Sequence, residues 1–192
     1  VLMPVFARDI LKGGPGTLGV LMAGGGAGAL VATLFLASRK SIVGLGSLIP
    51  VSSGIFAAGL IVFSFSRSTV LSALLLAVSG FGFMTHMAAS NTILQTVSDD
   101  DKRGRVMSFY SMAFMGMTPI GSLLGGALAD RIGAPNALIL GSVCCIAASA
   151  AFSSKLPLIQ KLIHPIYRKM GIIPEVASGV GAAARLTLPP ED

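Results

Sequence analysis

Charge is scarce in this sequence. Only 11% of its 192 residues are Asp, Glu, Lys or Arg, whereas 53% are hydrophobic, and the mean hydropathy is +0.83. A soluble domain carries charge on roughly a quarter of its residues, and a chain of this length has no core large enough to bury so much apolar surface. The composition excludes a soluble globular domain and predicts an integral membrane protein.

The sequence also lacks the residue sets of common catalytic and metal sites. It has no HExxH motif, no GxSG motif with a partner His and no pair of acidic residues within an apolar run, which argues against a membrane-embedded enzyme. The only cysteines, Cys144 and Cys145, are adjacent within an apolar run, so neither a disulfide nor a metal site is indicated. We expect no catalytic residues, no metal and no cofactor. Without a ring of charges or a filter-like segment, a channel is also disfavoured.

Long uncharged runs separate the few charged residues. Each run exceeds the roughly 20 residues that a helix needs to cross a bilayer. The runs are continuously apolar rather than alternating, which favours helices over strands, and a helix satisfies its own backbone groups in lipid. The predicted spans are 17–38, 43–65, 69–95, 106–128 and 134–154. The expected fold is all-α and polytopic.

Two shorter segments flank these spans. Residues 1–11 are apolar up to Arg8 and Asp9, and Gly13 to Gly16 (GGPG) end the run. Because no initiator Met or signal peptide precedes them, we interpret them as the end of a helix that has lost its beginning. We assign 1–154 to the membrane bundle and 155–192 to a tail. The tail begins with basic and apolar residues suited to an anionic lipid surface and is expected to end in disorder, as a solvated segment.

Lys and Arg are distributed unequally between the two ends of the predicted spans. With the C-terminus inside, ten basic residues lie inside and four outside, as the positive-inside rule requires. The inner ten are Arg39, Lys40, Lys102, Arg103, Arg105, Lys155, Lys161, Arg168, Lys169 and Arg185, and the outer four are Arg8, Lys12, Arg67 and Arg131. Topology thus accounts for the net charge of +6, and no nucleic-acid partner is indicated.

A compact charge cluster, DDDKRGR, occupies residues 99–105, although no acidic residue lies between Asp9 and Asp99. The acidic side chains and Ser98 can cap the helix that follows and interact with its dipole, while the basic ones anchor lipid phosphates. Alternatively, the cluster latches neighbouring helices in one conformation and releases them in another. Spacing alone favours the local role. The residues assigned to the gating or switch role are Asp101, Arg103, Gly104 and Arg105.

The fourth span combines Pro119 with Gly121 and Gly125. Pro removes an intrahelical hydrogen bond and predicts a bend. The two Gly residues are four apart, on one face, and permit close approach of another helix. A bent and smoothly packed helix suits a protein that alternates between two states, although static packing explains the same pattern.

Ionisable groups are nearly absent from the spans, which contain no Asp or Glu. His86 is the one titratable candidate for a proton or substrate contact, with Asn91 and Gln95 further along the same helix. An intramembrane His that faces a cavity suggests function, because imidazole exchanges protons near neutral pH. A packing role near the inner interface is the alternative.

Several of these segments resemble the major facilitator superfamily. They are VLMPVFARDIL, the Gly-rich LGVLMAGGGAGALVATLF and, above all, DKRGRVMSFYSMAFMGMTPIGSLLGGALADRIGAP. The likeness covers residues 1–154 and is strongest to the exporter branch that includes the enterobactin exporter and related multidrug-efflux-like proteins. It implies the C-terminal six-helix half, from the end of helix 7, which is truncated here, through helix 12. RGRVMS at Arg103 to Ser108 would fall in the cytoplasmic loop between helices 10 and 11.

The resemblance has departures and consequences. The loop ASRKSIVGLG lacks the acidic residue of the GxxxDRxGRR signature, and the similar DRxG at Asp130 to Gly133 falls at the outer end of helix 11, so no gating role passes to it. The pattern around Pro119 resembles the antiporter motif of helix 5. The resemblance implies alternating access between two six-helix halves around a central cavity, usually driven by protons.

We therefore expect a secondary active transporter, not an enzyme, that exports a small amphiphilic molecule or a siderophore. A membrane scaffold or assembly subunit is the main alternative, and a membrane-embedded enzyme a weaker one. The expected partners are membrane lipid, the N-terminal half of the same transporter, a small-molecule substrate and protons. The expected location is the inner (plasma) membrane, multi-pass, with the C-terminus in the cytoplasm.

Overall fold

The computed structural model describes residues 2–39 and 44–169, and these form helices and short connections without a strand. The helices are α1 (Met3–Val5), the π-helical η1 (Phe6–Ile10), α2 (Pro15–Ala37), α3 (Leu45–Phe65), α4 (Thr69–Val97), α5 (Asp100–Ile132) and α6 (Ala134–Lys169). Helices α2 to α6 are each long and apolar enough to cross a membrane. The predicted class, an all-α polytopic membrane protein, is confirmed.

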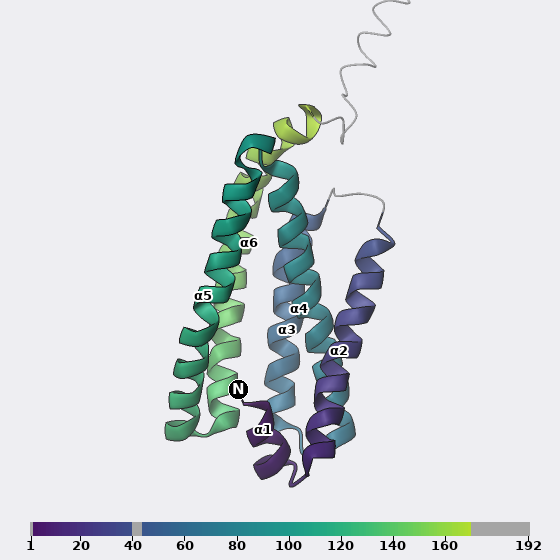
Figure 1. Cartoon of the computed structure of the whole chain (residues 1–192), viewed down its shortest axis with the longest axis vertical. Helices are drawn as coiled ribbons and strands as arrows, with labels where there is room; N and C mark the ends of the chain where they lie inside the picture. The colour runs from purple at the N-terminus through teal and green to yellow at the C-terminus, as the bar shows by residue number, and fades with distance from the viewer. Residues whose placement is uncertain (1, 40–43, 170–192) are drawn as a thin grey trace, which may run out of the picture.

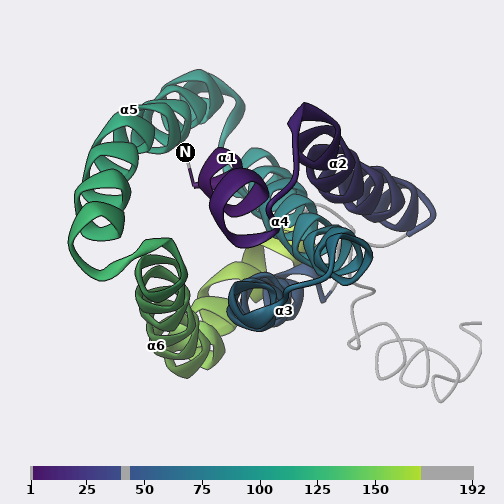
Figure 2. The ribbon, with the colours of Figure 1, turned by 90° about the horizontal axis from the view of Figure 1, so that it is seen from below.

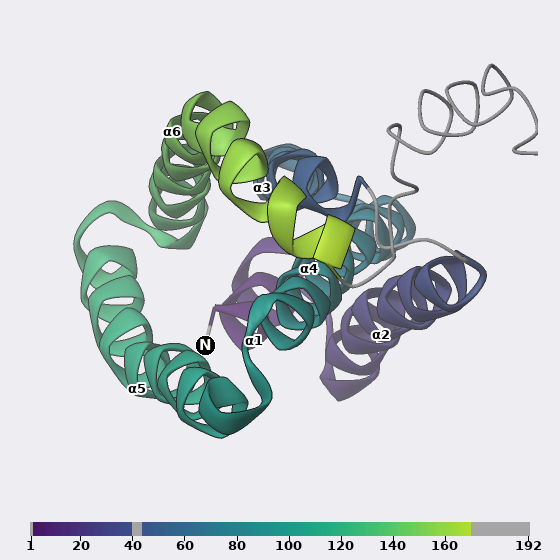
Figure 3. The same cartoon turned by 90° about the horizontal axis from the view of Figure 1, so that it is seen from above.

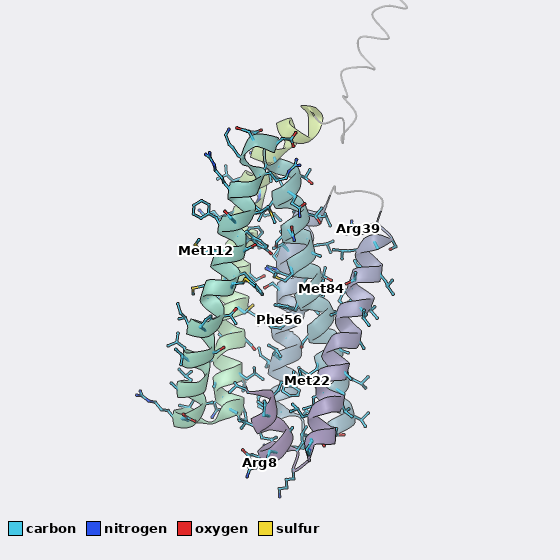
Figure 4. The ribbon with its side chains drawn as sticks, in the orientation of Figure 1. Arg8, Met22, Arg39, Phe56, Met84 and Met112 are labelled. Atoms are coloured by element: carbon cyan, nitrogen blue, oxygen red, sulfur yellow. The ribbon has the colours of Figure 1, made fainter. Side chains whose placement is uncertain are left out.

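The five long helices alternate in direction along one axis (Figure 1). The ends of α2, α4 and α6 therefore share one end of the bundle with the starts of α3 and α5. Figure 4 shows Arg39 at this end and Arg8 at the other. The charge clusters at the helix ends follow the same division, because residues 99–105 begin α5 and Arg131 ends it.

Two helices extend beyond the predicted spans. Helix α5 begins at Asp100, inside the charge cluster, and α6 continues to Lys169 rather than ending at 154. The reason for the longer α6 is an apolar stripe at helical spacing, formed by Phe152, Leu156 and Ile159, whose members are only partly exposed. Figures 1 and 3 show this part of α6 turning across the end of the bundle. The predicted disordered end, 170–192, lies outside the described residues.

Helix α4 forms the centre of the bundle and packs against α2 on one side and α3 on the other. Small residues bring the backbones together at both contacts. A methyl group at Gly28 of α2 would overlap the carbonyl group of Ala77, and one at Gly82 of α4 would lie 2.6 Å from the carbonyl oxygen of Ser52. A methyl group at Gly24 would likewise lie 2.5 Å from the carbonyl oxygen of Ala73, so this face of α2 packs closely on α4.

The N-terminal segment and one turn complete the fold. Phe6 is 1% exposed, and its ring lies 4.7 Å from that of Phe63 in α3, so α1 and η1 close the end of the bundle opposite Arg39. Gly133, between α5 and α6, has φ +85, a left-handed conformation that side chains rarely adopt. This conformation lets the chain reverse direction between two long helices.

Packing at Gly28 predicts a difference between two neighbouring substitutions. Gly28→Ala forces α2 away from α4 and should lower the free energy of unfolding by about 1–3 kcal/mol. Gly26→Ala is the matched control, since a methyl group there meets nothing within 4 Å, and it should be neutral or slightly stabilising. Denaturant titration of both variants in lipid nanodiscs measures the difference. Equal stability of the two would contradict the packing assigned to α2 and α4.

Candidate functional site

Helix α5 is the least packed long helix. None of its residues is buried, and its main contact is with α6. It meets α4 at few points, where the Tyr110 hydroxyl donates to the Met87 sulfur at 3.7 Å and the Phe114 and Phe83 rings lie 6.4 Å apart. Viewed from either end, α5 curves around the outside of the bundle (Figures 2 and 3). On its far side, Met112 points outward and is 67% exposed (Figure 4).

A cavity of about 610 Å³ separates α5 from the rest of the bundle. Gly121 and Gly125 line it from α5, and Phe6 and Phe63 line the opposite wall. A methyl group at either Gly would meet nothing within 4 Å, so no helix of the described residues packs against this face, and close helix approach at Gly121 and Gly125 stays a prediction. A helix face made of small residues packs closely only where a second helix lies opposite. In the described residues, a cavity lies opposite this face. Pro119 lies within the continuous helix α5, between the lining residues Thr118 and Gly121.

The charge cluster forms a local corner between α4 and α5. The Arg103 guanidinium bonds the Asp100 carboxylate at 2.7 Å, and its Nε donates to the carbonyl oxygen of Gln95 at 3.0 Å. Gln95 lies in the last turn of α4, where carbonyl groups lack helical partners, so Arg103 caps α4 and complements its dipole. Lys102 pairs with Asp99 at 3.1 Å.

The expected N-terminal capping by the acidic residues is wrong. Asp99 makes no side-chain hydrogen bond to the backbone of α5, and the Ser98 hydroxyl donates instead to the carbonyl of Leu94 in α4. The lysine and arginine one turn on compete for the same carboxylates, which explains the difference. Asp101, Gly104 and Arg105 are exposed, and neither Asp101 nor Arg105 has an ion pair with any side chain described in residues 2–39, 44–161 and 163.

His86 connects two helices. Its Nδ1 lies 3.3 Å from the carbonyl oxygen of Ile49 in α3, directly before Pro50. The same stretch of α3 is bonded from α6, because the Ser149 hydroxyl donates to the Pro50 carbonyl at 2.8 Å. His86 also lines a second cavity, of about 620 Å³, between α3, α4 and α6.

Asn91 and Gln95 do not join His86. They bond each other, Gln95 Nε2 to Asn91 Oδ1, and neither lines the cavity at His86. Five residues along a helix correspond to about 140° of rotation, so Asn91 lies on another side of α4. The three predicted contacts therefore form two separate groups.

Sequence reasoning missed the polar contacts between α3 and α6. In addition to Ser149, the Ser53 hydroxyl and the Cys145 sulfur lie 3.4 Å apart. The sequence feature that could have indicated these contacts is the group Pro50, Ser52 and Ser53 within an apolar span. Of Ser52 and Ser53, Ser52 is the one whose hydroxyl donates to its own helix, to the carbonyls of Leu48 and Ile49.

The comparison with known families decides the class of this bundle. Residues 1–170 match the family described as transmembrane secretion effector, a family of major-facilitator-type transporters. The chain belongs to the transmembrane secretion effector family. No curated protein and no solved structure matches it. Family and fold together identify a membrane transporter.

The contacts of Arg103 at the corner between α4 and α5 predict that substitutions of Arg103 and Arg105 have different effects. Arg103→Ala removes the cap on α4, and the amides near Gln95 and Asp100 should exchange hydrogen about two- to tenfold faster, the effect of one lost hydrogen bond. Arg105→Ala should leave their exchange unchanged. Hydrogen exchange read by mass spectrometry compares the variants. Equal exchange in both would contradict the capping role.

Proposed function

We propose that this chain is the C-terminal half of an alternating-access exporter that uses the proton gradient to expel a small amphiphilic molecule or a siderophore. The observation that carries the proposal is that α5 is long enough to span a membrane and has no buried residue. The chain that contains it belongs to a family of transporters. A helix bordered by a cavity can move without separating tightly packed surfaces. Such movement is what rearrangement around a substrate requires.

The proposed partners follow from this mechanism. They are membrane lipid, the N-terminal half of the same transporter, the substrate and protons, with no nucleic acid. We place the protein in the inner (plasma) membrane with the Arg39 end of the bundle and the C-terminus in the cytoplasm. The excess of Lys and Arg at that end supports this orientation. The resemblance to the enterobactin-exporter branch supports export as the direction.

His86 is the proposed contact for a proton or substrate, supported by its place in a cavity wall. Asn91 and Gln95 are proposed as a second polar contact on the other side of α4. The competing function is that of a scaffold without transport activity. The exposed apolar residues along α5 favour this alternative, because such a surface also suits a permanent protein partner.

Substrate-dependent proton movement separates transporter from scaffold. The complete protein, as the cell makes it, is placed in liposomes that contain the pH indicator pyranine. We expect one of two added compounds, a catecholate siderophore or the uncharged amphiphile Nile red, to cause proton flux that a protonophore abolishes. Flux equal to that of empty liposomes with both compounds would contradict proton-driven export of these classes.

A cross-link tests whether α5 must move in that assay. In a background with Cys144→Ser and Cys145→Ser, Met87→Cys with Tyr110→Cys allows a short bifunctional thiol reagent to join α4 and α5. The cross-link should abolish flux, and a reagent with a reducible linker should restore it after reduction. The control pair, Ser66→Cys with Ser72→Cys, joins the end of α3 to α4, where the hydroxyls lie 2.9 Å apart, and should preserve flux.

For the charge cluster, we propose a switch role for Asp101, Arg103, Gly104 and Arg105 in addition to the corner contact. Arg103→Ala combined with Arg105→Ala should lower transport severalfold at normal expression, because both guanidinium groups are removed from the surface that faces neighbouring helices. The Lys102→Ala variant serves as a charge control, since Lys102 pairs only with Asp99 in its own helix turn. Unchanged transport in the double variant would limit the cluster to a structural role.

A further inference from the structure

The cavity at His86 is distinct from the one beside Gly121. The two share no lining residue, and the cavity at His86 lies at the other end of the bundle, among α3, α4 and α6, with Tyr110 of α5 at its edge. The last part of α6 covers it, since Phe152, Ile159 and Ile163 belong to its wall. Leu156, on the same stripe, lies close to Gly46 at the start of α3.

The wall is apolar and uncharged. None of its residues is Asp, Glu, Lys or Arg, and Ile, Leu, Val and Phe side chains make up much of it. A charged ligand would lose its hydration without gaining a counter-charge, which is costly. The volume of about 620 Å³ lies within the roughly 300–1,000 Å³ of small-molecule sites.

Two polar groups of the wall, the Ser90 hydroxyl and Nε2 of His86, have no hydrogen-bond partner among the described side chains and backbone. Ser53 and Ser149 bond Cys145 and the Pro50 carbonyl, whereas Ser90 makes no side-chain hydrogen bond within the described residues. The carbonyl of Ile49 can only accept, so Nδ1 of His86 carries the proton of that bond. In the neutral imidazole, Nε2 is then a hydrogen-bond acceptor.

We propose that this cavity binds an uncharged, mainly apolar small molecule with a hydroxyl group, which donates to Nε2 of His86. The Ser90 hydroxyl is positioned one turn along the same wall to bond the ligand oxygen. The inference rests on the His86 contact proposed above and names its ligand class, but binding here requires neither a second half nor a proton gradient, so it can fail or succeed independently of proton-driven export.

This sequence contains no Trp, and the signal of an introduced Trp is read as the difference from the complete protein without the substitution. Phe152→Trp places one fluorophore in the cavity wall, and Phe109→Trp places one on α5 at a residue that is 71% exposed. The probe is 4-(4-bromophenyl)butan-1-ol, whose bromine quenches Trp, added to the complete protein in lipid nanodiscs. We expect saturable quenching in the Phe152→Trp variant only, and linear quenching by lipid-dissolved probe in Phe109→Trp. Linear quenching in both would overturn the proposal.

Two further comparisons test the ligand class and the His86 contact. Ala148→Phe, in the Phe152→Trp background, fills the cavity without removing a hydrogen bond and should abolish saturation. The methyl ether of the probe lacks the donor and should bind about two- to tenfold more weakly than the alcohol. His86→Phe should weaken the alcohol to the level of the ether and leave the ether unchanged. Equal affinity of alcohol and ether for the protein with His86 would overturn the assigned contact, whether or not His86→Phe folds.

Discussion

Close contact between the backbones of α4 and its two neighbours is the interaction on which the rest of this bundle depends. In lipid, apolar side chains gain little by meeting each other, so helices associate through close packing and hydrogen bonds. Gly28 and Gly80 allow α2 and α4 to approach closely, and Gly59 and Gly82 do the same for α3 and α4. A methyl group at any of these four glycines would overlap or crowd the facing helix. This packed centre provides a fixed frame against which α5, α6 and their cavities are arranged.

The polar contacts form a second level of organisation on this frame. They concentrate at the turn of α3 that contains Pro50, where the carbonyls of Ile49 and Pro50 lie within hydrogen-bond distance of His86 and Ser149. Each contact satisfies a donor that lipid cannot satisfy. They also determine the chemistry of the neighbouring cavity, because they occupy one ring nitrogen of His86 and leave the other. A single turn of α3 thereby receives contacts from two other helices.

Sequence alone predicts much of this fold, because in a membrane the uncharged runs directly delimit the helices. The GxxxG signal is less informative. At Gly24 and Gly28 helix α4 lies opposite, whereas at Gly121 and Gly125 a cavity does within the described residues. The motif states that a face can be approached closely, and only the tertiary arrangement supplies the partner. The same limit applies to His86 and Asn91, because two residues that are close in the sequence of α4 need not lie on the same side of the helix. The Ser53 and Ser149 contacts join residues far apart in the chain, so the polar run in α3 could indicate one side of these contacts but not the partner in α6.

The contrast between the centre and α5 suggests how a transporter of this family combines stability with motion. Displacing α4 would break close contacts along two helices at once, and packed interfaces of this kind are not continuously deformable. Displacing α5 would break few contacts, because cavities lie beside it near both ends, at Gly121 and at Tyr110. The Arg103 corner and the Gly133 turn hold its two ends. A helix fixed at its ends and free along its length can flex at Pro119 while the frame stays intact, so the stable contacts and the mobile ones need not compete.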